Sequence, residues 1–175
     1  SDVAETAAVA ISGVSGADAT ESGTQSVTIT INDNESTPTI TLAVSATSIA
    51  ENAGSSLTLT ATSSIASGSD ITVSLGTAST ATEGTDYSEL NNITIEAGST
   101  TATSTFVPIN DSMYETSTDE TATITIASVS GGSASINTSS DDVTITIEEN
   151  DDPPTVTLAA SASSIEENSD SSITL

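Results

Sequence analysis

The chain has 175 residues, of which 25 are Asp or Glu and none is Lys, Arg or His, so its formal net charge at pH 7 is -25. This charge disfavours nucleic acid as a partner, because phosphate binding needs Lys or Arg, and it disfavours anionic membrane surfaces likewise. No apolar stretch approaches the roughly 20 residues of a membrane span, so no direct membrane insertion is expected. The absence of Cys and Lys excludes disulfides and Lys-Asn isopeptide crosslinks.

Short segments that alternate Thr or Ser with Ile, Leu or Val follow one another along the chain and indicate β-strands, whose successive side chains point to opposite faces. Gly, Ser, Asn and Asp separate these segments, and no helical period is visible. The pattern predicts an all-β fold, an antiparallel two-sheet sandwich with apolar side chains inside and Thr outside. Its seven predicted strands are 39 to 44, 56 to 62, 70 to 75, 92 to 96, 101 to 109, 121 to 129 and 142 to 147.

An internal repeat organises the chain and predicts a tandem array. Residues 26 to 59 realign without a gap on residues 142 to 175, a shift of 116, and residues 5 to 16 match residues 120 to 131 with a shift of 115. A window from a longer array explains these matches better than a polymer of separate copies, because tail and head together lack the middle strands. The predicted domains are the C-terminal part of one repeat over 1 to 34, a complete repeat over 35 to 150, and the N-terminal part of the next over 151 to 175.

Acidic residues gather at the ends of the predicted strands, where a sandwich can bring them to one pole. Like charges a few Å apart repel by about 1 kcal/mol per pair even in water, and the chain has no cation of its own. Calcium takes about six to eight oxygen ligands. The chain offers carboxylates without His or Cys, which favours calcium over zinc or copper.

Three motifs carry a resemblance to a known family. They are GTDY at 84 to 87, IND-x-MYE with a following DETATITI at 109 to 126, and VTITIEEND at 143 to 151. The combination resembles Calx-beta repeats, which occur in sodium/calcium exchangers, an integrin subunit and many large bacterial surface proteins. The resemblance covers 35 to 150 and extends into both flanking fragments. It implies a seven-strand immunoglobulin-like sandwich that binds calcium between the loops at one end.

The resemblance also implies a set of calcium ligands. One acid precedes the second strand, one belongs to the D-Y pair, three lie in the acidic segment before the sixth strand, and two lie in the closing triplet. At one further position the family uses a backbone carbonyl. In that order the residues are Glu51; Asp86; Asp111, Glu115 and Glu120; Glu149 and Asp151; and Met113 for the carbonyl. The chain departs from the pattern at Asn110, Ser112 and Asn150, where richer calcium binders carry Asp.

No enzymatic role is expected, because the chain has no His, Cys or Lys to act as nucleophile or base. We expect a calcium-stabilised structural repeat in the stalk of an extracellular or cell-surface adhesin or filament of bacterial origin. Its partners would be neighbouring repeats of the same chain. Association with other copies in a filament is a further option that the sequence does not decide. Two alternatives stand beside this one. A repeat that itself binds carbohydrate or protein predicts a distinctive apolar or aromatic patch, and a salt-adapted acidic surface needs no specific calcium.

Overall fold

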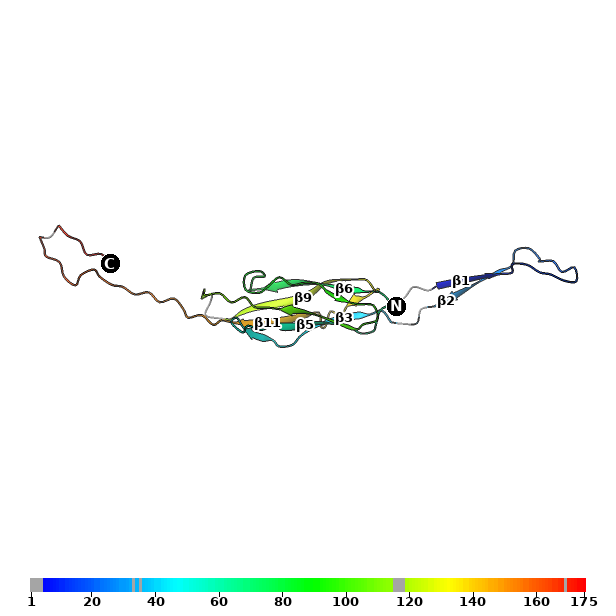
Figure 1. The fold of residues 1–175 in the computed structure, drawn as a ribbon, viewed down its shortest axis with the longest axis horizontal. Helices are drawn as coiled ribbons and strands as arrows, with labels where there is room; N and C mark the ends of the chain where they lie inside the picture. The colour runs from blue at the N-terminus through cyan, green and yellow to red at the C-terminus, as the bar shows by residue number, and fades with distance from the viewer. Residues whose placement is uncertain (1–4, 33, 35, 115–118, 169) are drawn as a thin grey trace.

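The computed structural model describes residues 5 to 32, 34, 36 to 114, 119 to 168 and 170 to 175. Figure 1 shows a central sandwich, with a hairpin extending from one end and the segment after the last strand extending from the other. Among the described residues, no helix is long and apolar enough to cross a membrane. The strands are β1 Glu5–Ala10, β2 Ser26–Ile31, β3 Thr39–Val44, β4 Ser48–Ala50, β5 Leu57–Ser63, β6 Ile71–Ser79, β7 Ile93–Ile95, β8 Thr101–Phe106, β9 Glu120–Ser130, β10 Ser135–Ile136 and β11 Asp142–Glu148.

Two sheets form the sandwich. One has the order β10-β3-β5-β8 and the other has the order β4-β11-β9-β6-β7. Each of the seven predicted strands is present, so the all-β sandwich is confirmed. Two short pairs that the sequence did not predict are parallel, β10 with β3 and β4 with β11. The second arises because the chain leaves β3 in one sheet and continues as β4 at the edge of the other, beside β11.

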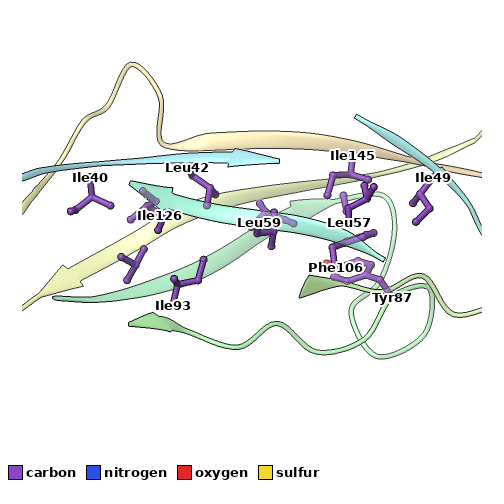
Figure 2. Packing of buried hydrophobic residues seen from close by; sticks show 14 of the residues in the cluster. Ile40, Leu42, Ile49, Leu57, Leu59, Tyr87, Ile93, Phe106, Ile126 and Ile145 are labelled. Atoms are coloured by element: carbon purple, nitrogen blue, oxygen red, sulfur yellow. The ribbon is translucent and has the colours of Figure 1, made fainter. Parts of the chain in front are cut away.

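The core follows from the alternation of side chains. In β5, Leu57, Leu59 and Ala61 are buried, whereas Thr58 between them is exposed. Fully burying a Leu or Ile side chain contributes about 1.5 to 3 kcal/mol. The rings of Tyr87 and Phe106 stack with centroids 4.8 Å apart, and Figure 2 shows them near Leu57. The other core residues are Ile40, Leu42, Ile49, Ile71, Val73, Ala81, Ile93, Ile95, Ala122, Ile124, Ile126, Ile145 and Ile147.

Two strand ends differ from the prediction by more than one residue. β8 ends at Phe106 rather than at residue 109, because Pro108 has no N–H for a sheet ladder and instead forms an isolated bridge with Tyr87. β6 extends beyond residue 75, since it continues to pair with β9 after a register shift between Ser74 and Leu75. Neither change moves an apolar side chain out of the core.

The β1–β2 hairpin repeats the pairing of β9 with β11. Glu5 lies opposite Ile31, and Glu120 lies opposite Ile147, which are the same positions after the shifts of 115 and 116 residues. The apolar side chains of the hairpin are nevertheless exposed, whereas β9 and β11 bury theirs against the other sheet. The exposed set comprises Val9, Ile11, Val27, Ile29 and Ile31.

The segment after β11 shares a local feature with the sandwich. The Ser161 N–H donates to the Thr174 carbonyl at 2.9 Å, and the Thr174 N–H donates to Ser161 Oγ at 3.0 Å. Ser45 and Thr58, which are 116 positions earlier, make the same two bonds at 3.0 and 2.9 Å. The same two hydrogen bonds thus recur in a segment whose apolar side chains Val156, Leu158 and Leu175 are exposed.

Candidate metal centre

The parallel pair β4–β11 brings acidic residues to one end of the sandwich. Ala50 at the end of β4 lies opposite Glu148 at the end of β11. The Glu51 N–H continues this ladder by donating to the Glu148 carbonyl at 3.1 Å. Because the two strands run in the same direction, the residues that follow them meet at the same edge. Glu51 follows β4, and Glu149 and Asp151 follow β11.

These three acids converge. Each offers a carboxylate oxygen, and the three oxygens lie within 4.8 Å of one another. Glu51 is buried, and Glu149 and Asp151 are partly buried. Two oxygens bound to one calcium ion at about 2.3 to 2.6 Å can be at most about 4.6 to 5.2 Å apart, whereas the corresponding limit for magnesium is about 4.2 Å. Each pair of these oxygens is therefore within the reach of one calcium ion.

The chemistry of the donors also fits calcium. Asp151 Oδ2 is buried and has no hydrogen-bond partner among the residues that the structure describes. A buried carboxylate oxygen without a partner costs free energy unless a donor or a cation meets it. No side chain can supply the cation, because the chain has no Lys, Arg or His. A cation from solution that prefers oxygen ligands satisfies this requirement.

Glu51 links the group to the predicted acidic loop. The Asp111 N–H donates to Glu51 Oε1 at 2.8 Å, and the Met113 N–H donates to Asp111 Oδ1 at 2.6 Å. Burial raises the pKa of Glu51 above its usual 4.5, and the charges of Glu149, Asp111 and Asp151 raise it further. The hydrogen bond from Asp111 lowers that pKa. Ionisation of Glu51 is thus less favourable in the folded protein than in the unfolded chain, and a bound cation would offset this cost.

The loop after β11 is shaped around Glu149. Glu149 Oε1 accepts the N–H groups of Asn150 and Asp151, each at 2.7 Å. The Glu149 N–H donates to Asp119 Oδ1 at 3.3 Å. Asp119 was absent from the predicted ligands, although its position carried a signal. It directly precedes Glu120, the first residue of β9, and β9 pairs with β11.

The remaining predicted ligands lie outside the group of three. Asp86 is buried, and its Oδ2 accepts the Thr82 N–H at 2.5 Å. Met113 is 66% exposed, and Glu120 is partly buried at the start of β9. Glu115 lies outside the described residues. The ligand roles of these residues stay predictions.

Glu51 also borders an open hollow of about 490 Å³. A typical small-molecule site has mainly apolar and aromatic walls. Among the described residues that line this hollow, none is aromatic and most are small or polar. The hollow therefore does not favour a carbohydrate-binding module. Its other lining residues are Asn52, Gly54, Ser55, Ser56, Val107, Pro108 and Asn110.

The comparisons with known proteins agree with this architecture. No protein-family model and no curated protein matches the sequence. The structure matches the crystal structure of the apo-form Calx CBD1 domain with a TM-score of 0.52 and 19% sequence identity, covering 65% of this chain and 99% of that one. The fold is an immunoglobulin-like β-sandwich. More particularly it is the Calx-beta fold, and the resemblance stated from the sequence motifs is confirmed at the level of fold.

Proposed function

We propose that the complete repeat is a Calx-beta module that binds at least one calcium ion through Glu51, Glu149 and Asp151. The observation that carries the proposal is the convergence of three carboxylates within 4.8 Å, one of which has a buried oxygen without a hydrogen-bond partner in the described part of the chain. Bound calcium would supply the positive charge that the chain lacks. Asp111 would orient Glu51 through its backbone N–H.

The ion would act at the exit of the repeat. Glu51 belongs to the segment after β4, whereas Glu149 and Asp151 belong to the segment that leaves the sandwich after β11. An ion held by all three would tie the exit segment to its own domain. Pro153 and Pro154 follow immediately and restrict the backbone further. The proposed role of calcium is therefore to stabilise the repeat and to stiffen its joint with the next.

We further propose that the chain belongs to a tandem array that forms the stalk of an extracellular or cell-surface adhesin or filament, with no catalytic role. The β1–β2 pair and the β9–β11 pair have the same register. This supports the proposal that the hairpin and the sandwich belong to successive repeats of one period. Neighbouring repeats of the same chain are the proposed partners, and they would cover the apolar side chains that the β1–β2 hairpin exposes. Flanking sequence should continue the period of 116 residues, and flanks without it would contradict the stalk.

Thermal unfolding of the chain in calcium, in magnesium and in chelator, at one moderate ionic strength, tests calcium binding. A ligand that binds the folded state alone stabilises it by about 1.4 kcal/mol at a tenfold excess over Kd and by about 2.7 kcal/mol at a hundredfold excess. Calcium should raise the melting temperature, and magnesium should substitute poorly because it requires tighter octahedral geometry. Equal curves in calcium and chelator would favour the salt-adapted surface instead.

A further inference from the structure

Among the described strands, β8 is a long edge strand that lacks charge, proline and a bulge. Edge strands expose unpaired backbone groups, and proteins guard them by shortness, charge, proline or bulges. In the described sandwich the edges β10, β4 and β7 have two or three residues, whereas β8 has six. β8 reads TATSTF, without charge or proline, and it pairs with β5 in unbroken register. Its inward side chains Ala102 and Ser104 are only partly buried, as expected at an open edge.

The pairing with β5 identifies which backbone groups of β8 face outward. The Ser63 N–H donates to the Thr100 carbonyl at 2.8 Å. In an antiparallel pair, successive residues direct their N–H and C=O groups to opposite sides. Thr101, Thr103 and Thr105 therefore direct theirs away from β5. These three threonines are exposed.

The chain itself already extends this edge beyond β8. The Val107 carbonyl accepts the Ser88 N–H at 2.9 Å, and the Ile109 N–H donates to the Asp86 carbonyl at 2.9 Å. Both groups continue the outward-facing series of alternate residues. The edge thus accepts an added backbone segment along residues 107 to 109, whereas no described residue pairs with its outer side along residues 101 to 105.

Charge selects the occupant of the open stretch. None of the 25 acidic residues lies in β10, β3, β5 or β8, whereas the strands of the other sheet include Glu120, Asp142 and Glu148. Two copies of a chain with a charge of -25 repel one another, and this repulsion is screened over about 8 Å in physiological salt. They meet most easily where both surfaces lack carboxylates. A basic peptide would be drawn to the acidic regions instead.

We propose that β8 of one chain pairs antiparallel with β8 of a second copy. The two four-stranded sheets then form one continuous sheet around a two-fold axis, held by main-chain hydrogen bonds from Thr101, Thr103 and Thr105. This pairing goes beyond the proposed function, because it needs no calcium ion. It sets two stalks side by side through their uncharged sheets.

Sedimentation velocity of residues 1 to 175 over a range of concentrations, at 0.15 M salt, tests the pairing. The wild-type chain should self-associate, with or without chelator. Thr103→Pro removes an outward N–H without touching the β5 ladder, a position at which an edge strand tolerates proline, and it should lower the association constant at least tenfold. Thr103→Glu keeps that N–H but adds like charges across the two-fold axis, and it should have the same effect.

Thr60→Glu is the matched control, because Thr60 lies opposite Thr103 on β5 and on the same outer face. In the paired sheet the two copies of residue 60 would be three strand spacings apart, about 14 Å, which exceeds the screening length. The association constant should change by less than about twofold. A monomeric wild-type chain overturns the proposal, as does undiminished association of a folded Thr103 variant. An equal loss in Thr60→Glu would assign the contact to the sheet face and not to its edge.

Discussion

Replacing Glu51 by Gln should stabilise the protein in chelator and destabilise it in calcium. Gln retains an oxygen that can accept the Asp111 N–H, which lies 2.8 Å from Glu51 Oε1. It removes a charge that lies within 4.8 Å of carboxylate oxygens of Glu149 and Asp151. Two unit charges at that distance repel by about 0.9 kcal/mol in bulk water and by about 3.5 kcal/mol at an effective dielectric constant of about 20.

The net gain in chelator follows from these terms. Relief of two pairs at the bulk-water value gives about 1.7 kcal/mol as a lower bound. Exchanging a charged hydrogen-bond acceptor for a neutral one costs about 1 kcal/mol. The variant should therefore be more stable than the wild type by about 0.7 kcal/mol or more, which corresponds to a rise in Tm of about 3 to 6 °C for a domain of roughly 100 residues.

In calcium, the wild type should be more stable than Glu51→Gln. The wild type gains about 2.7 kcal/mol at a hundredfold excess of calcium over Kd, whereas the variant has lost a ligand and gains little. Denaturant or thermal unfolding in chelator and in calcium measures both differences. Asp142→Asn provides the control, because it removes one charge from the exposed opposite end of β11 and should leave the calcium response unchanged. A Glu51→Gln variant that is less stable in both media would show that Glu51 acts as a structural hydrogen-bond acceptor and not as a calcium ligand.

Two further outcomes follow from the same site. Because the pKa of Glu51 is raised in the folded state, protonation of Glu51 contributes stability that is fully present below its usual value of 4.5 and is lost as the pH rises through the folded-state value. In chelator, the advantage of Glu51→Gln over the wild type should therefore shrink as the pH falls through this window, and an advantage that stays constant from pH 7 to 4 in unfolding curves would contradict the raised pKa. Small-angle scattering of three complete repeats in tandem should give a maximum dimension near three domain lengths in calcium and a broader distance distribution in chelator, whereas an unchanged distribution would assign the geometry to the short linker and its prolines alone.

The sequence predicted the strands well because Thr alternates with Ile, Leu and Val at a period of two, and burial of one face of each strand fixes that alternation in the structure. It did not predict β4 or β10, because each contains a single large apolar residue, Ile49 and Ile136, and so shows no alternation. The pairing of β4 with β11 is nevertheless what brings Glu51 beside Glu149 and Asp151.

The sequence predicted which acidic residues belong to the candidate site better than it predicted the contacts between them. Glu51, Glu149 and Asp151 were predicted together, and the structure brings them together. The contact of Asp119 with Glu149 depends on how β9 and β11 end side by side, which a single motif does not encode. The burial that raises the pKa of Glu51 likewise depends on packing between segments far apart in the sequence.

Isothermal titration of calcium into the chain tests the central claim most directly. The measurement should be made at 0.15 M salt with excess magnesium, and repeated at about 1 M salt, where the Debye length falls to about 3 Å and diffuse counterion attraction is largely screened. We expect saturable binding of at least one calcium ion per complete repeat under both conditions, and a strongly weakened isotherm for Glu51→Gln. Binding that does not saturate, or that disappears at high salt equally in the wild type and the variant, would contradict a specific calcium site at Glu51, Glu149 and Asp151.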